Sequence, residues 1–327
     1  MKYLLDIIIP CYNSENTLNN TVKSIEVQNT NFEFEIIIVD DGSTDKTSEV
    51  IDHLKNRYLN IRSYYQQNLK QSMARNIGIR HSIAKYIMFV DSDDILEPDM
   101  LRTMIGEMNI KGRDLTVCGI KKRYFNHEII ENKSSLIGIN DKNKLLISYL
   151  TQNKELDVGL WNKIYKLSII KKNNLFFSNG NFFEDSLFNL KYICCCNISK
   201  IEFISTPFYI LNKGNNNTTR NFKPEIDNLA LNYVVKAFQV LDRKNIKVPY
   251  KYKIGFEKRI LIYVVHHHIK YDKGWSCEKQ KKYCKSLRVK FSDFIGGSVL
   301  PLKYTIAYIL IKNVPKIYSI IYSRYNL

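Results

Sequence analysis

One pattern occurs twice in this chain, as Phe34-Glu35-Ile36-Ile37-Ile38-Val39-Asp40-Asp41-Gly42-Ser43 and as Tyr86-Ile87-Met88-Phe89-Val90-Asp91-Ser92-Asp93-Asp94. Each stretch is an apolar run with the length of a buried strand, followed at once by acidic residues. In an open α/β sheet, ligands bind beyond the carboxyl ends of the strands. Packing explains the two acidic clusters poorly, and they predict a site that holds a nucleotide, a divalent metal or both.

Strand and helix patterns alternate around these stretches over the first 120 residues. Apolar residues at helical spacing predict helices between the strands, as in the segment that follows Pro98. Such alternation implies an α/β fold with a mainly parallel sheet covered on both faces. It fades after residue 120, and from Ile226 onward the pattern is helical. We predict strands at 4–9, 34–39, 61–65, 86–90 and 115–120.

Positive charge is concentrated at the C-terminal end. The formal net charge is +17, and residues 241–327 hold 19 Lys and Arg against 5 Asp and Glu. Seven cysteines without zinc-ligand spacing are typical of reduced thiols in a cytosolic protein. The first residues show no signal-peptide pattern, and no uninterrupted apolar stretch is long enough to predict a membrane-spanning helix.

Six short motifs follow one another along residues 1–222. They are Ile8-Ile9-Pro10-Cys11-Tyr12-Asn13, Val39-Asp40-Asp41-Gly42-Ser43-Thr44-Asp45, Ser72-Met73-Ala74-Arg75-Asn76, Val90-Asp91-Ser92-Asp93-Asp94, Trp161-Asn162-Lys163-Ile164-Tyr165-Lys166 and Phe183-Glu184-Asp185-Ser186-Leu187-Phe188. In this order they resemble the motifs of the family 2 glycosyltransferases, inverting enzymes of GT-A fold that build bacterial surface polysaccharides. The resemblance implies a GT-A-type nucleotide-binding domain, with 1–120 for the nucleotide sugar and 121–222 for the acceptor. The helical, basic C-terminal region, 223–327, would follow it and serve membrane-surface or oligomer contact.

The resemblance implies transfer of a hexose or N-acetylhexosamine from a nucleotide sugar, with a UDP-sugar as the expected donor. Asp41 would accept the imide N–H of uracil, although Asp-Asp-Gly-Ser is also ordinary turn chemistry. Tyr12 would stack on the base or pack in the core. Arg75 would contact the diphosphate, because its fork matches phosphate oxygens; a solvated helix arginine is the alternative. The nucleotide-sugar-binding residues would be Pro10, Tyr12, Asp40, Asp41, Asn68, Arg75, Asp91 and Ser92.

One segment departs from the family pattern. Leu69 and Lys70 stand where relatives usually carry two glycines. Glycine allows positive φ and close backbone approach, so the substitution puts a backbone phosphate cradle in doubt. Lys70 would add positive charge near the phosphates instead.

A divalent cation, Mn²⁺ or Mg²⁺, would neutralise the departing nucleoside diphosphate. By the resemblance, Asp93 ligates this metal, and Asp91 contacts the metal through water or binds the ribose. The alternative is that these carboxylates only cap the loop that follows them.

Inversion requires a general base for the acceptor hydroxyl. Asp185 matches the base of the family, with Glu184 beside it, and repulsion between adjacent carboxylates raises one pKa. Favourable charge at the start of a helix is the alternative explanation for this pair. Trp161 would face an acceptor sugar or pack in the core, and Lys213 and Arg220 would belong to a lid over the diphosphate.

The C-terminal region combines lysines with aromatic and aliphatic residues in short helical runs broken at Pro301 and Pro315. Amphipathic basic helices lie in membrane interfaces, so we expect peripheral attachment to the inner face of the cell membrane, where a glycan or polyprenyl-linked acceptor would be met. A solvated helical domain or a homo-oligomer interface is the alternative. No nucleic-acid motif accompanies the charge. Two rival functions remain at this point: a nucleotidyltransferase of similar fold and a non-catalytic scaffold for glycan assembly.

Overall fold

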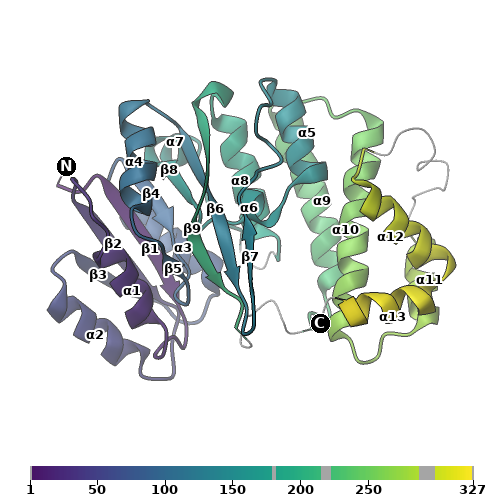
Figure 1. Cartoon of the computed structure of the whole chain (residues 1–327), viewed down its shortest axis with the longest axis horizontal. Coiled ribbons are helices and arrows are strands. Elements are labelled where there is room, and N and C mark those ends of the chain that lie inside the picture. The colour runs from purple at the N-terminus through teal and green to yellow at the C-terminus, as the bar shows by residue number, and fades with distance from the viewer. Residues whose placement is uncertain (1, 179–181, 215–221, 287–298, 326–327) are drawn as a thin grey trace. The chain divides into compact units, whose positions relative to one another are not determined.

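The computed structural model describes residues 2–178, 182–214, 222–286 and 299–325. The chain forms two compact units (Figure 1). The first consists of Met1–Lys142 and Asn153–Gly214, and the second of Asn143–Gln152 and Asn215–Leu327. The boundaries predicted for the three parts, at 120 and 222, stay predictions. What the three predicted parts bind stays a prediction.

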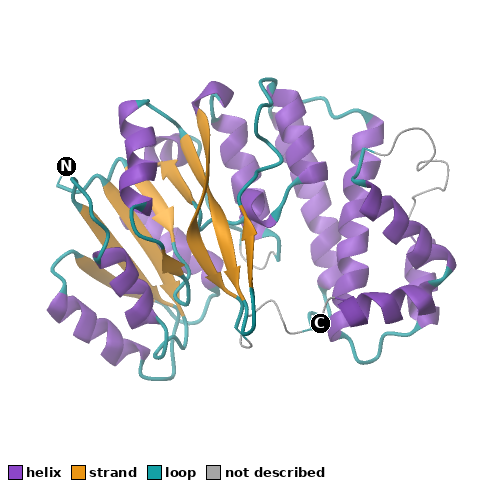
Figure 2. Cartoon of the chain, in the orientation of Figure 1, coloured by secondary structure: helices purple, strands orange, loops and turns teal. Residues whose placement is uncertain are grey.

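The first unit is built on a mixed sheet (Figure 2), which in the described residues has nine strands in the order β3-β2-β1-β4-β8-β6-β9-β5, with β7 beside β6. The strands β3, β2, β1 and β4 are parallel, as the alternating pattern predicted. β8, β7 and β5 run antiparallel to their neighbours, which the sequence did not predict. The strands are β1 (Leu5–Cys11), β2 (Phe34–Asp40), β3 (Ile61–Tyr65), β4 (Tyr86–Phe89), β5 (Ile95–Leu96), β6 (Leu115–Arg123), β7 (Glu128–Glu131), β8 (Lys163–Lys166) and β9 (Ile201–Asn212).

Helices cover both faces of this sheet, which confirms the predicted α/β class. In Figure 1, α1 and α4 lie in front of the sheet and α3 lies behind it. α3 packs so tightly on β1 that a Cβ at Gly78 would lie 2.4 Å from Cγ2 of Ile8. The helices of this unit are α1 (Leu18–Glu26), α2 (Thr47–Arg57), α3 (Gln71–His81), α4 (Met100–Ile110), α6 (Glu155–Val158), α7 (Leu167–Lys172), α8 (Glu184–Cys195) and the one-turn η1 (Ile198–Lys200).

The order of the parallel strands places the acidic clusters. β1 lies between β2 and β4, so the direction in which strands are added reverses there. At such a switch point the loops after neighbouring strands separate and leave room for a ligand. The register pairs Cys11 with Asp40 and Ile8 with Phe89. The two clusters therefore follow strands on either side of β1, at one edge of the sheet.

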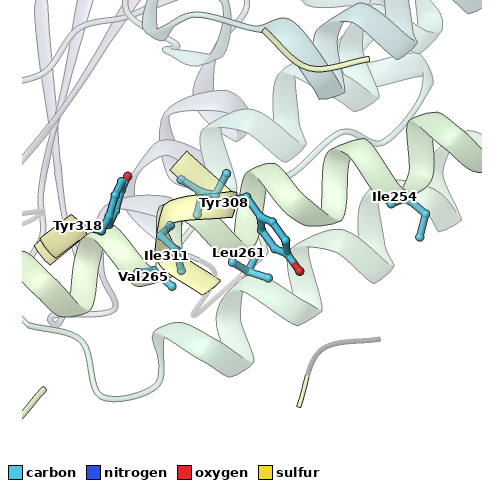
Figure 3. Close-up of a cluster of buried hydrophobic side chains, with 7 residues drawn as sticks. Ile254, Leu261, Val265, Tyr308, Ile311 and Tyr318 are labelled. Atoms are coloured by element: carbon cyan, nitrogen blue, oxygen red, sulfur yellow. The ribbon is translucent and has the colours of Figure 1, made fainter. Parts of the chain in front are cut away.

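The second unit is helical. Figure 3 shows its core, in which Tyr308 and Ile311 of α12 and Tyr318 of α13 pack with Leu261 and Val265 of α10. None of the described helices is both long and apolar enough to cross a membrane. The helices are α5 (Lys142–Gln152), α9 (Ile226–Arg243), α10 (Tyr250–Tyr271), α11 (Cys277–Ser286), α12 (Leu302–Asn313) and α13 (Pro315–Tyr325).

Three consecutive histidines on α10 have different partners. His266 bonds to the hydroxyl of Tyr318, and Nε2 of His267 accepts from the backbone N–H of Lys223. His268 lies between the carboxylates of Asp227 and Asp272. These three side chains therefore point to different parts of the second unit.

Candidate active site

The first acidic cluster organises its own loop. Oδ1 of Asp40 accepts hydrogen bonds from the backbone N–H and the hydroxyl of Ser43, at 3.0 and 2.6 Å. Oδ1 of Asp41 accepts from Nε2 of Gln66 at 2.6 Å and from the backbone N–H of Leu69 at 2.8 Å. Asp40 therefore supports its own loop. Binding of a nucleotide sugar by Asp40 and Asp41 stays a prediction.

The second cluster is anchored to β9. The hydroxyl of Tyr209 donates to Oδ2 of Asp94 at 2.9 Å and accepts from the backbone N–H of Asp91 at 3.2 Å. The hydroxyls of Ser92 and Ser14 lie 2.8 Å apart. A buried tyrosine and a serine pair thus fix the turn that carries Asp91 and Asp93.

Asp93 stands out among these carboxylates. No hydrogen bond joins its carboxylate to another residue in the described part of the chain, although its backbone carbonyl accepts from Asn212. Burial raises its pKa to about 6, with a further contribution from the charge of Asp91. A partly buried carboxylate that receives no hydrogen bond from another residue is a group that an added cation would stabilise.

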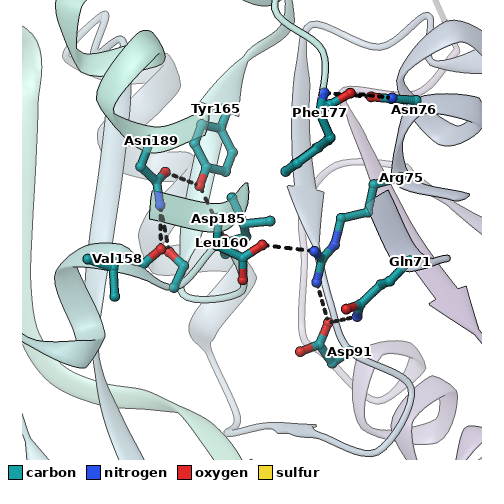
Figure 4. Close-up of polar contacts among 11 residues, drawn as sticks. Gln71, Arg75, Asn76, Asp91, Val158, Leu160, Tyr165, Phe177, Asp185 and Asn189 are labelled. Carbon is teal, nitrogen blue, oxygen red and sulfur yellow. Dashed lines mark hydrogen bonds and ion pairs between the residues drawn. The ribbon is translucent and has the colours of Figure 1, made fainter. Parts of the chain in front are cut away.

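Arg75 connects the second cluster with α8 (Figure 4). Its Nη2 donates to Oδ1 of Asp91 at 3.0 Å, and its Nη1 donates to Oδ1 of Asp185 at 2.9 Å. The side chain is 2% exposed and lies over the ring of Phe177, 5.6 Å from its centroid. Gln71, one turn earlier on α3, donates to the same oxygen of Asp91 at 2.9 Å. The alternative of a solvated helix arginine is therefore wrong. Arg75 instead joins two carboxylates that lie 94 residues apart in the sequence.

The candidate base lies in the first turn of α8. Burial raises the pKa of Asp185, while the guanidinium of Arg75 opposes this rise. Burial and the adjacent Asp185 raise the pKa of Glu184 to about 7. The sequence argument expected such a rise from the adjacent charge, but desolvation is the larger cause. One of the two carboxylates can thus take up a proton near neutral pH.

The motif around Trp161 is mostly internal. The indole is 5% exposed and stacks on Tyr209 with ring centroids 5.1 Å apart, which favours the core-packing alternative for this residue. Lys163 is 1% exposed and donates to the carbonyls of Leu156 and Gly159. This internal lysine was not foreseen, although its position inside an apolar strand pattern was a signal.

The remaining predicted residues surround this edge of the sheet or lie elsewhere. Pro10 is buried in β1, and Tyr12 just after it is 46% exposed and available for stacking. Oδ1 of Asn68 accepts from Nζ of Lys70 at 3.1 Å. Lys213 is ion-paired with Glu155 at 2.5 Å, and Arg220 lies outside the described residues. Their roles at the donor or as a lid stay predictions.

Comparisons relate this chain to known glycosyltransferases. The family model described as glycosyl transferase family 2 matches residues 6–174. The chain is 32% identical to the cholesterol galactosyltransferase of Borreliella burgdorferi over 218 residues, which are 64% of this chain and 60% of that protein. It is 27% identical to the glycosyltransferase GlyG of Streptococcus pneumoniae, over 67% of this chain and 74% of the relative. A match to the minor teichoic acid biosynthesis protein GgaA of Bacillus subtilis covers 57% of this chain and 42% of that protein, at 28% identity.

A solved structure has the same fold. Residues 1–349 of S. aureus TarS, crystallised with UDP-GlcNAc, superpose with a TM-score of 0.67 at 18% identity, covering 98% of this chain and 89% of that one. This confirms the expected GT-A-type domain followed by a helical region. The family model covers more than half of the chain and includes both acidic clusters and Arg75. The chain belongs to glycosyl transferase family 2.

Proposed function

We propose that the protein is an inverting glycosyltransferase that moves a hexose or N-acetylhexosamine from a UDP-sugar to a hydroxyl group of a glycan or lipid-linked oligosaccharide. The product would enter a bacterial capsule, exopolysaccharide, O-antigen or teichoic acid. The observation that carries this proposal is the bridge from Asp91 through Arg75 to Asp185. It places the candidate base of α8 beside the acidic turn expected to face the donor. The complex of TarS with UDP-GlcNAc, a protein of the same fold, supports the choice of donor.

In this reaction Asp185 would accept the proton of the acceptor hydroxyl, while Arg75 fixes the orientation of its carboxylate. Because one oxygen of Asp185 is bound to Arg75, the other oxygen is the proton acceptor. Attack from this side would displace the nucleoside diphosphate and invert the anomeric centre. Glu184, with a pKa of about 7, would hold a proton nearby at neutral pH.

The carboxylates of this edge suit a divalent cation. Asp93 offers a carboxylate to which no other described residue donates, and Asp91 has one oxygen not used by Arg75 or Gln71. Hard oxygen ligands with positions open to substrate fit Mg²⁺ or Mn²⁺. No group of three or more His, Cys, Asp or Glu that could hold a metal alone occurs in the described residues, so phosphate oxygens would complete the shell. Such a cation would neutralise charge on the leaving diphosphate.

The test is product analysis with purified protein, UDP-sugars, Mn²⁺ or Mg²⁺ and candidate acceptors. We expect release of UDP and a product of inverted anomeric configuration by NMR. Asp185→Asn should abolish transfer while UDP still binds, and Asp52→Asn, which alters an exposed carboxylate of α2, should be active. Full turnover by Asp185→Asn would refute the assignment of the base. Release of a sugar 1-phosphate, which leaves when UMP rather than the sugar is transferred, would indicate a nucleotidyltransferase. Inertness with every donor would indicate a scaffold.

We further propose that the second unit attaches the protein to the inner face of the cell membrane. Leu302, Ile306 and Ile309 form an exposed stripe on α12, because their spacing places them on one helix face. On α13, Ile317, Ile320 and Ile321 are likewise exposed. Exposed lysines 303, 312 and 316 accompany both stripes. Apolar residues flanked by lysines match the interface of an anionic membrane.

Sedimentation with vesicles tests this attachment. We expect binding to anionic vesicles at low salt, loss of binding at high salt, and little binding to zwitterionic vesicles. Exchange of Lys303, Lys312 and Lys316 for Gln should weaken binding, whereas the same exchange at three exposed lysines of the first unit, Lys23, Lys55 and Lys111, should not. Equal effects of both triple variants would mean that vesicle binding depends on the net charge of the protein and not on the lysines of α12 and α13. A dimer that buries the isoleucines instead would indicate the oligomer alternative.

A further inference from the structure

Lys70 has a backbone conformation that its residue type disfavours. Its φ is 76° and its ψ is 160°, a region that is occupied almost only by glycine. The other non-glycine residues with positive φ in the described chain are Asn13, Asp99, Asn174 and Asn245. Asn and Asp tolerate positive φ, because their short polar side chains bond locally to the backbone. Lysine has no such compensation, so a strained conformation is retained where glycine would be free of strain.

The neighbours of Lys70 are bound to both acidic clusters. The backbone N–H of Leu69, immediately before it, donates to Asp41 at 2.8 Å. The side chain of Gln71, immediately after it, donates to Asp91 at 2.9 Å. The hydrogen bonds of its two neighbours, one to each acidic cluster, thus hold Lys70 between the carboxyl ends of β2 and β4. This arrangement explains how the strained backbone is held.

The charge of Arg75 is not free for a phosphate. Two of its five N–H groups, one on each terminal nitrogen, bind carboxylates, and the side chain is only 2% exposed, so its charge is largely committed to Asp91 and Asp185. Lys70, in contrast, is exposed on the loop between the two clusters. Its Nζ donates one hydrogen bond, to Asn68 at 3.1 Å, which leaves two of its three protons for another acceptor. A lysine ammonium on a flexible stem binds phosphate oxygens as a point charge.

We propose that Lys70 binds the diphosphate of the nucleotide-sugar donor, and that the strained backbone is retained to present its ammonium there. This inference rests on the proposed function, since it takes a nucleoside diphosphate as the ligand of the site. It assigns the main phosphate contact to Lys70, whereas the sequence indicated Arg75. Lys70 stands at a position where the backbone conformation favours glycine.

The experiment compares Lys70→Gly, Lys70→Gln and Lys70→Arg in the full chain, with Lys111→Gln as a control for loss of one exposed lysine charge. UDP and uridine binding are measured by titration calorimetry with Mn²⁺ present, and stability by thermal unfolding without ligand. Lys70→Gln and Lys70→Gly should each weaken UDP binding about tenfold, because each removes a charge-assisted hydrogen bond. Uridine binding should be unchanged, and Lys70→Arg should retain most of the affinity for UDP.

Thermal unfolding separates the effect of the strained backbone at Lys70 from the effect of its charge. Lys70→Gly should unfold at a higher temperature than wild type, because glycine adopts this backbone without strain, while Lys70→Gln should not. Wild-type affinity of Lys70→Gln for UDP would overturn the proposal and leave the proposed function standing. A variant that loses UDP and uridine equally would also overturn it, since the loop rather than the charge would then be responsible. If the wild type binds no UDP, the donor assignment fails and the role of Lys70 fails with it.

Discussion

Replacement of Arg75 by Met should uncouple the two carboxylates that it joins. Its terminal nitrogens lie 2.9 Å from Asp185 and 3.0 Å from Asp91, in a side chain that is 2% exposed. Unit charges about 4 Å apart attract by about 4 kcal/mol at an effective dielectric constant of about 20. Water reaches Asp185 and Asp91, which are 32% and 25% exposed, and the desolvation of Arg75 offsets part of the attraction. We therefore expect a coupling of about 2 kcal/mol between Arg75 and Asp185.

The assay is a double-mutant cycle of Arg75→Met and Asp185→Asn by urea unfolding at pH 8. The chain has two tryptophans, so a Trp275→Phe background makes the fluorescence report on Trp161 in the first unit. Arg75→Met alone should cost about 3–5 kcal/mol, because it leaves two carboxylates without their cation. The double variant should be about 2 kcal/mol more stable than the sum of the single effects predicts.

An exposed ion pair provides the matched control. Arg102 and Asp99 are 2.9 Å apart at the start of α4, and their side chains are 54% and 46% exposed. Arg102→Met and Asp99→Asn should couple by about 0.5 kcal/mol or less, as exposed pairs do. A coupling between Arg75 and Asp185 no larger than that of the control would refute the bridge as an energetic link.

Four further predictions concern other groups. Glu184 has a folded-state pKa of about 7 against an ordinary value of 4.5, so its contribution to stability is complete below pH 4.5 and lost as the pH rises through 7. Glu184→Gln should therefore be about 1–2 kcal/mol more stable than wild type at pH 8 in urea unfolding, with no gain at pH 4.5. The folded-state pKa of Asp93 is likewise raised, to about 6, so Asp93→Asn should unfold at a higher temperature than wild type at pH 8 in chelator. We expect Mn²⁺ to raise the unfolding temperature of the wild type but not that of this variant. Lys163→Met should cost about 2 kcal/mol in urea unfolding, because the carbonyls of Leu156 and Gly159 lose a buried donor; unchanged stability would contradict this role. The variant with Gln at Lys303, Lys312 and Lys316 should bind anionic vesicles about 100-fold more weakly, at about 1 kcal/mol per lysine, as measured by sedimentation.

The sequence predicted the parallel half of the sheet well, because its signals are local. An apolar run followed by acidic and turn residues predicted a strand at 34–39, and β2 covers Phe34–Asp40. The antiparallel placement of β8 was not predictable, because the partners of Lys163–Lys166 on β4 and β6 lie far away along the chain. Local pattern cannot reveal such pairings.

The candidate site shows the same contrast. The motifs predicted Asp93 and Asp185 as site residues, and the order of the strands and the start of α8 place both at the same edge of the sheet. The partners of Arg75 lie 16 and 110 residues away, so its fork could not be assigned to carboxylates rather than phosphates. The sequence left two roles for Trp161, contact with an acceptor sugar and packing in the core. Its stacking on Tyr209 favours packing in the core. Roles that depend on a distant partner thus needed the structure.

The charges at this edge of the sheet bear on how a donor enters. Arg75 supplies one positive charge to Asp91 and Asp185, and Asp93 carries a further carboxylate to which no other described residue donates a hydrogen bond. The local balance is therefore negative before any substrate arrives, even with Lys70 on the adjacent loop. A nucleoside diphosphate is itself an anion, and like charges repel strongly where water is partly excluded. A divalent cation bound there would reverse this balance, so we expect it to act first on donor affinity. UDP should bind far more weakly in chelator than with Mn²⁺, and Asp93→Asn, which removes one negative charge, should narrow that difference in affinity.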